Sequence, residues 1–245
     1  MAQIIAVAIQ KGGTGKTTTA AAIAQAAAAR GLTVLAVDLD PQANLSLALG
    51  ANMTGGNAYS LIADGQPAAD CIRATAQHID IIPASASLST VTSSRGSARR
   101  LQNALQPIKD NYRLIVIDTP PTAGELQYNA MQAATGLIIP LQADIYSLQS
   151  LYQVADTARQ IQKSNPSLVI KGIVFTQYDR RSTLSRQMRE AITQQAAEIE
   201  IPTLGAIRNG IAVKEAAALK QSLFDYAPGS NPAKDYLELF NALNI

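Results

Sequence analysis

A short run near the N-terminus brings together residue types that can hold the phosphates of a nucleotide. Its members are Lys11, Gly12, Gly13, Thr14, Gly15, Lys16, Thr17 and Thr18. Glycines let backbone N–H groups turn inward, and a following helix N-terminus adds further donors to phosphate oxygens. In such a loop the Lys16 ammonium contacts the β- and γ-phosphates and the Thr17 hydroxyl binds Mg²⁺. The run therefore predicts a site for a nucleoside triphosphate with magnesium.

The loop departs from the common phosphate-binding pattern G-x-x-x-x-G-K-[ST] at its first position, where Gln10 replaces glycine. Gly12 and Gly13 supply the backbone freedom instead, and Lys11 adds a cation for which the common pattern has no role. A glycine-rich loop without a ligand is the alternative. The apolar segment before the loop and the helical segment after it favour the phosphate-binding interpretation.

Carboxylates follow two other apolar segments. Asp118 comes directly after 114–117, the usual place for a carboxylate that holds Mg²⁺, often through water. Asp40 follows 33–37 and is expected to lie close to the loop in a doubly wound sheet. Asp38, at the same strand end, is expected to support the structure or the magnesium. The alternative for Asp40 and Asp118 is a turn or helix-capping role, because both precede prolines.

Strand-like and helical segments alternate along the chain. Strands are expected over 4–9, 33–37, 79–82, 114–117, 137–139, 169–175 and 204–207, and helices over 17–30, 96–109, 124–134, 146–163, 183–198, 212–220 and 232–243. The strands are apolar throughout, which predicts a sheet covered on both faces. The alternation predicts a doubly wound, mostly parallel α/β sheet in one domain over 1–245. Residues 52–78 are expected to be loop, with a short helix at 59–63.

Composition excludes several classes of protein. The single cysteine, Cys71, cannot form an internal disulfide, and no apolar run approaches the roughly 20 residues of a membrane span. The C-terminal segment 232–243 carries no basic face, so no membrane partner is expected. We therefore expect a cytoplasmic protein. The net charge of +2 is too small to indicate a nucleic-acid partner without further evidence.

The spelling of the loop, Lys11 to Thr18, resembles the deviant Walker A motif of the ParA/MinD ATPases, whose early lysine is the signature lysine. Three other segments support the resemblance: 37–44 resembles the first switch, 117–121 the second, and 178–185 a segment typical of ParA proteins. Only nine residues precede Gln10, so the chain resembles the short form that has no N-terminal helix-turn-helix domain.

The resemblance implies an ATP-dependent homodimer in which Lys11 reaches the phosphates bound by the partner subunit. It assigns Asp40 to orienting the attacking water, with Thr17, Asp40 and Asp118 grouped around the magnesium. It also implies slow, partner-stimulated ATP hydrolysis that depends on Lys11, Lys16 and Asp40. The nucleotide is expected to be contacted further along the chain by Gln177, Arg208 and Asn209, although Ile207 replaces the proline of the family pattern.

ParA proteins bind DNA without sequence specificity through basic residues of their C-terminal half. The candidates here are Arg186, Arg189, Lys214 and Lys220. Arg186 and Arg189 are three residues apart on one expected helix, so they share a face. A solvated helix face is the alternative, since Glu190 offsets part of the charge.

The implied function is DNA partition, of a plasmid or a chromosome, on the nucleoid, with a ParB-like activator as partner. A MinD-like ATPase that cycles on membranes and a positioning ATPase for a non-DNA cargo are the alternatives. An electron-transfer ATPase with an iron–sulfur cluster is excluded because one cysteine per chain gives two per dimer where four are needed. A kinase would need an acceptor site, and the sequence gives no sign of one.

Overall fold

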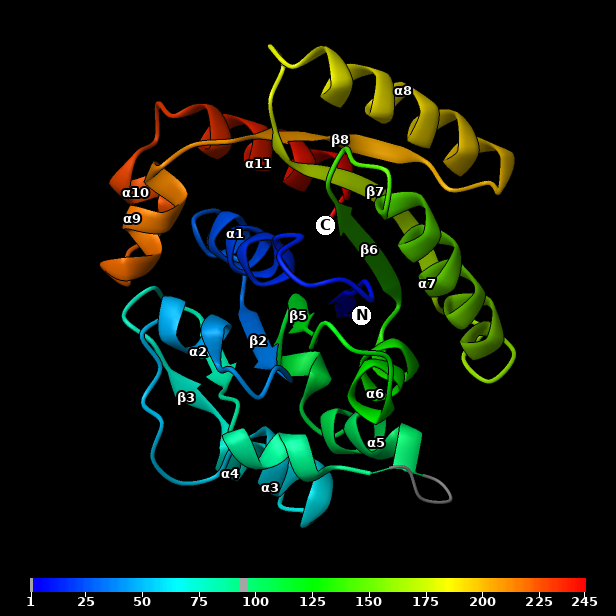
Figure 1. The fold of residues 1–245 in the computed structure, drawn as a ribbon. Helices are drawn as coiled ribbons and strands as arrows, with labels where there is room; N and C mark the ends of the chain where they lie inside the picture. Colours follow the sequence, from blue (N-terminus) through cyan, green and yellow to red (C-terminus); the bar gives the residue numbers. More distant parts are fainter. Residues whose placement is uncertain (1, 93–96) are drawn as a thin grey trace.

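The computed structural model describes residues 2–92 and 97–245, and within them eight strands form one sheet (Figure 1). The strands are β1 Gln3–Val7, β2 Val34–Asp38, β3 Arg73–Ala74, β4 Asp80–Ile82, β5 Leu114–Asp118, β6 Gly136–Leu141, β7 Val169–Tyr178 and β8 Thr203–Arg208. Their order is β3-β4-β2-β5-β1-β6-β7-β8, and β3 alone runs antiparallel to its neighbour. The predicted mostly parallel sheet is confirmed.

Alternation along β1 shows why its residues are apolar throughout. Ile4 and Ala6 belong to the core on one face of the sheet, while Ile5 and Val7 belong to the core on the other face. Successive side chains of a strand point to opposite faces, so a strand covered on both sides needs apolar residues at every position. The core therefore has two layers, one on each side of the sheet.

Helices cover both faces (Figure 1). One layer is formed by α3 Ala58–Ala63, α4 Ala68–Cys71, α5 Arg100–Leu105, α6 Glu125–Ala133, α7 Ser147–Gln162 and α8 Thr183–Glu198. The other is formed by α1 Lys16–Ala28, α2 Asn44–Ala48, α9 Ala212–Ala218, α10 Leu223–Tyr226 and α11 Asn231–Ala242. This arrangement is the predicted doubly wound α/β fold.

The sheet order brings the functional segments together. β1 lies between β5 and β6, with β2 on the far side of β5. The register pairs Val7 with Asp118, and it pairs Asp38 with Asp118 on the other side of β5. The carboxyl ends of β1, β2 and β5 therefore meet at one edge, where ligands bind in open parallel sheets.

Several predicted boundaries were wrong. The helix expected over 96–109 is a 3₁₀ turn at Ser97–Arg99 followed by α5, which ends at Leu105 ahead of Pro107; residue 96 lies outside the described part. Pro107 has no backbone N–H with which to continue the helical hydrogen bonds, which explains the early end. The strand expected over 4–9 ends at Val7, where the chain turns into the loop.

Within the described residues, four short α-helices and strands were not predicted, and neither were the 3₁₀ helix at Ala86–Thr90 and most of the one at Lys109–Asn111. The four are α2, α4, β3 and α10, each between two and five residues long. Such elements hold too few residues to show a hydrophobic period, so their neighbours in the fold decide their conformation. One of them, α2, begins four residues after Asp40 and carries Ser46.

Candidate nucleotide-binding site

The loop between β1 and α1 places free backbone donors at its centre. Gly13 and Gly15 have φ of 73° and 76°, in the left-handed region that glycine adopts without steric cost. Gly15 is the residue before α1 and has no side chain to cap it. The first N–H groups of a helix lack partners inside the helix, and its dipole favours an anion there. The start of α1 is therefore built to accept phosphate oxygens.

Lys16 lies across this loop and is almost fully buried. Its side chain is 6% exposed, and its Nζ donates a hydrogen bond of 2.9 Å to the carbonyl of Lys11. Burial lowers the pKa of Lys16, while the nearby carboxylates of Asp118 and Asp40 act in the opposite direction. The lysine predicted to contact the phosphates is thus held over the loop and faces two of the predicted acidic residues.

Thr17 and Asp118 form a direct pair at the same end of the sheet. The Thr17 hydroxyl donates to Asp118 Oδ2 at 2.6 Å, and the carboxylate is fully buried. Burial first, and the charge of Asp38 second, raise the pKa of Asp118 well above its usual range. A hydroxyl and a carboxylate side by side are the hard oxygen ligands that Mg²⁺ prefers, and a bound cation would offset the cost of burying the charged carboxylate.

Residues 2–92 and 97–245 contain no cluster of three His, Cys, Asp or Glu side chains placed to hold a metal ion. Mg²⁺ commonly keeps several waters and takes one or two carboxylates together with the phosphates of its substrate. The donor set at Thr17 and Asp118 suits that mode of binding, and these two residues would be the ones to hold the ion.

Asp38 stabilises the first switch segment. Its Oδ1 accepts the backbone N–H of Asp40 at 3.1 Å, and its Oδ2 accepts both the N–H and the hydroxyl of Ser46 at 2.8 and 2.7 Å. Burial raises the pKa of Asp38 to about 6. Of the two roles left open for Asp38, its contacts match the structural one. Asp40 is 7% exposed, and its Oδ1 caps the N–H of Gln42 at 2.9 Å.

Lys11 turns toward its own chain. Its Nζ lies 2.5 Å from Asp144 Oδ2 and 3.3 Å from the hydroxyl of Ser147, at the turn between β6 and α7. Sequence reasoning missed Asp144, which stands three residues after the end of the apolar strand β6. That position was the one available signal.

Side chains from β6 and β7 hold the outer carbonyls of the loop. Thr176 Oγ1 donates to the carbonyl of Thr14 at 2.8 Å, and the amides of Gln177 and Gln142 donate to that of Gly13 at 2.8 and 3.2 Å. Gln177, predicted to contact the nucleotide, therefore lies against the loop with its amide donating to the backbone. Gln142 was not predicted, and nothing in its sequence context distinguishes it.

Arg208 and Asn209 lie together at the end of β8. Arg208 forms a bidentate pair with Asp235 of α11, in which Nη2 and Oδ1 are 2.6 Å apart. Asn209 and Arg208 line a cleft of about 600 Å³ with Arg180, Arg181 and Lys214. The partner of Arg208 was not expected from the sequence, since Asp235 stands in a helix 27 residues away.

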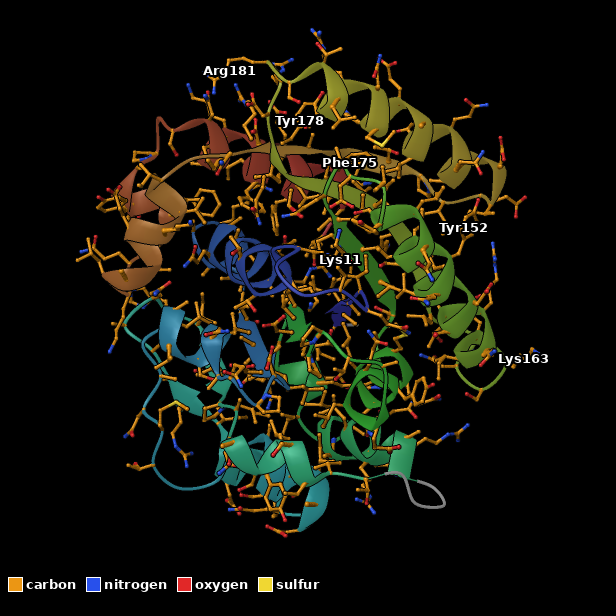
Figure 2. All side chains as sticks on the ribbon, viewed as in Figure 1. Lys11, Tyr152, Lys163, Phe175, Tyr178 and Arg181 are labelled. Carbon is orange, nitrogen blue, oxygen red and sulfur yellow. The ribbon has the colours of Figure 1, made fainter. Side chains whose placement is uncertain are left out.

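The four predicted DNA-contacting residues differ in exposure and in the elements that carry them. Arg186 is exposed on α8, whereas the guanidinium of Arg189 packs over the rings of Phe175 and Tyr178, at 5.9 and 5.2 Å from their centroids. Phe175 and Tyr178 are labelled on β7 in Figure 2. The other two, Lys214 and Lys220, are exposed on α9 and just after it. A pair three apart on a helix can therefore still differ in exposure: Arg186 is exposed and donates to the Thr183 hydroxyl, whereas Arg189 is half-buried.

A parallel sheet whose first strand leads through a glycine-rich loop and a Lys-Thr pair into a buried helix defines a P-loop nucleoside triphosphatase. Residues 2–170 match a family described as an AAA domain. The chain is 34% identical to the sporulation initiation inhibitor protein Soj of Bacillus subtilis, covering 98% of this chain and 97% of the relative. It is 40% identical to the chromosome partitioning protein ParA of Caulobacter vibrioides, over 78% and 75% of the two chains. The chain therefore belongs to the ParA/MinD family.

Solved structures agree with this assignment. Cobyrinic acid a,c-diamide synthase of Mycobacterium smegmatis, with bound ATP analogue and magnesium, superposes with a TM-score of 0.85 at 28% identity, over 100% of this chain and 95% of that one. A nucleotide with magnesium thus binds to this fold in a relative. No helix in the described part of the chain is both long enough and apolar enough to cross a membrane.

Removing the buried charge of Asp118 is expected to stabilise the nucleotide-free chain. Because the folded pKa lies above the usual value of about 3.9, the stability that Asp118 contributes is present at low pH and is lost as pH rises through the folded pKa. Asp118→Asn should therefore melt about 2–4 °C above the parent at pH 8, a gain of about 1 kcal/mol, and the gain should shrink toward pH 5. Thermal melting in EDTA measures it, with the exposed Asp64→Asn as control. A gain that grows as pH falls would contradict the assignment.

Proposed function

We propose that this protein is a partition ATPase that binds ATP with Mg²⁺, dimerises in that state, binds DNA without sequence specificity, and hydrolyses ATP when a ParB-like partner stimulates it. The observation that carries the proposal is the loop itself, with buried Lys16 over its centre, the Thr17–Asp118 pair beside it, and a second lysine, Lys11, at its edge. Kinship with a chromosome partitioning ParA supports the choice of cargo.

The residues divide the chemistry between them. Lys16 and the N–H groups at the start of α1 neutralise phosphate charge, and Thr17 with Asp118 holds the magnesium, which supplies further neutralisation when bound. Asp40 orients the attacking water from the first switch, which Asp38 stabilises through Ser46. Asn209, at the mouth of the cleft beyond β8, is proposed to contact the adenine, together with Arg208.

DNA is proposed to bind to exposed cations of the C-terminal half rather than within the cleft that is assigned to the adenine. They are Arg186 on α8, Lys214 on α9 and Lys220 just after α9; of these, Lys214 also lines the cleft. Each copy offers a modest patch, and a dimer doubles it. Phosphate contacts of this kind suffice for binding without sequence readout. The proposed location is therefore the nucleoid, in the cytoplasm.

Replacing Lys11 by Ala is expected to remove both ATP-dependent dimerisation and DNA retention, because the cation that would reach the partner subunit's phosphates is lost. Size-exclusion chromatography with light scattering, and DNA retention with ATP, ADP or no nucleotide, measure the two effects. The parent should retain DNA with ATP but not with ADP or without nucleotide. If it makes six or more phosphate contacts, raising the salt from about 50 to about 200 mM should weaken DNA binding about a thousandfold.

Lys163→Ala is the control, since Lys163 is exposed at the C-terminal end of α7. Retention of DNA by the Lys11 variant equal to that of the parent would refute the role of Lys11. If the ATP-bound parent ignores DNA at low salt, the partition function fails, and sedimentation with anionic vesicles then separates a membrane-cycling ATPase from one that positions another cargo.

A further inference from the structure

One carboxylate ties the end of β8 to α11, the helix that lies beside this strand (Figure 1). Asp235 Oδ2 accepts the backbone N–H of Arg208 at 2.8 Å and its Nε at 2.9 Å, and Oδ1 accepts Nη2 at 2.6 Å. Asp235 is only 7% exposed. The guanidinium is planar and is held at two nitrogens, and the N–H of the same residue is held as well, so the chain at Arg208 has little freedom to move.

The next two residues of the chain are held by neighbouring elements too. The backbone N–H of Asn209 donates to the carbonyl of Tyr178 at 3.3 Å. At Gly210 a Cβ atom would lie 2.7 Å from Cγ of Pro232, so the chain passes directly against the first turn of α11. The segment 208–210 is therefore fixed from two sides, by β7 and by α11.

The side chain of Asn209 is the part of this segment that is left to meet a ligand. It is exposed at the cleft beyond β8, and among the described residues its amide has no hydrogen-bond partner. The charge of Arg208, in contrast, is already matched by Asp235. Arg208 therefore contributes to the cleft by holding its neighbour in place rather than by offering a free cation.

An asparagine amide can distinguish the two purines. Its oxygen accepts from the N6 amino group of adenine while its nitrogen donates to N7, whereas guanine presents the acceptor O6 in place of the amino group. Both bonds form only when the amide has the right position and angle, because hydrogen bonds weaken steeply with misalignment. Whatever fixes the backbone at Asn209 therefore also affects the choice of base.

We infer that Asp235 is a positioning residue for the base of the nucleotide: through Arg208 it holds the Asn209 amide where that amide bonds adenine and rejects guanine. The inference rests on the proposed function, because it concerns the adenine contact that is assigned there to Asn209. An amide that makes both bonds to a base discriminates against the wrong base by about tenfold or more. Loss of the Asp235 contact should remove most of this discrimination.

Asp235→Asn tests the inference, because it removes the charge and one of the acceptors that face Arg208 but keeps the size of the side chain. Calorimetric titration with ADP and with GDP, each with Mg²⁺, compares two nucleotides that share their phosphates, so the ratio of the dissociation constants reports on the base. The parent should prefer ADP about tenfold or more. The variant should lose most of that preference through weaker binding of ADP, with GDP binding unchanged.

Glu238→Gln is the matched control. Glu238 is exposed on the same helix and acts on Arg208 by its charge, with no hydrogen bond between the two. This variant should keep the parental ratio of dissociation constants. In an Asn209→Ala background, where the amide is gone, Asp235→Asn should change the ratio no further, because the effect acts through that amide.

A purely structural role of Asp235 would weaken the binding of ADP and GDP equally, and that result overturns the inference, as does a parental ratio in the Asp235 variant. If Asp235→Asn does not fold, Arg208→Lys, which keeps the charge but cannot make the two-pronged contact, should show the same loss of preference, and a retained preference overturns the inference. A parent that binds ADP and GDP equally also overturns it and leaves the phosphate site intact. A parent that binds neither refutes the proposed function, and the inference fails with it.

Discussion

Replacing Lys16 by Ala is expected to weaken ATP binding at least about 100-fold and to leave no measurable hydrolysis. Lys16 is almost fully buried over the phosphate-binding loop, where a charge-assisted hydrogen bond in low dielectric is strong. Losing about 3 kcal/mol of contact to a phosphate corresponds to this change in affinity. Fluorescent nucleotide titration and phosphate release measure the two quantities.

The same substitution removes a buried cation that lies near Asp40 and Asp118, so the melting temperature of the nucleotide-free chain is measured alongside binding. Comparison with Lys163→Ala, which is exposed and remote from the loop, separates a site effect from a general one. Circular dichroism checks that the variant is folded before binding is measured. A folded Lys16 variant with parental ATP affinity would contradict the proposed site.

Replacing Asp40 by Ala is expected to lower stimulated ATP turnover about 100-fold or more while leaving the ATP-bound dimer intact. Positioning and proton transfer by a side chain contribute about 100- to 10,000-fold. Asp40 touches neither the glycines of the loop nor Lys11 by hydrogen bond; its Oδ1 caps Gln42 instead. Binding and dimerisation should therefore survive, and DNA retention with ATP should last longer than for the parent.

Ser46→Ala offers a graded control for Asp40. Ser46 donates its backbone N–H and its hydroxyl to Asp38, which in turn accepts the N–H of Asp40. The Ala variant keeps the N–H bond and removes only the hydroxyl bond, which loosens the segment without touching the Asp40 carboxylate. Turnover of this variant should fall between those of the parent and Asp40→Ala. Single-turnover assays with the activator present measure all three. An Asp40 variant that hydrolyses ATP at the parental rate would remove Asp40 from the mechanism.

The sheet and the centre of the site could be predicted from local patterns. Uniformly apolar strands predicted a sheet covered on both faces. The loop residues lie within a few positions of one another, so a single segment of the sequence was enough to recognise them. Asp118 was recoverable because strand ends in a parallel sheet meet at one edge. In each case the informative residues are near neighbours in sequence, or they stand at the ends of successive parallel strands.

Contacts between distant segments could not be predicted in this way. Asp144 meets Lys11 across 133 positions, and Asp235 meets Arg208 across 27. Nothing local distinguishes these aspartates from others on helices and turns. Arg189 illustrates the same limit: the helical spacing placed it beside Arg186 correctly, but its exposure depends on Phe175 and Tyr178 of another strand. The partners and the exposure of these side chains depend on how distant segments pack together, and the spacing of residues along the sequence does not show this.

The anchoring of the loop carbonyls has a further consequence. The carbonyls of Lys11, Gly13 and Thr14 are already engaged, by Lys16, by Gln142 and Gln177, and by Thr176. The loop is thus preorganised, and little conformational entropy is lost when a nucleotide enters. A rigid cradle of this kind grips the phosphates common to ATP and ADP about equally. Discrimination between ATP and ADP must then come from outside the phosphate-binding loop. A single subunit would therefore distinguish the two nucleotides poorly, and a pair of subunits would distinguish them well.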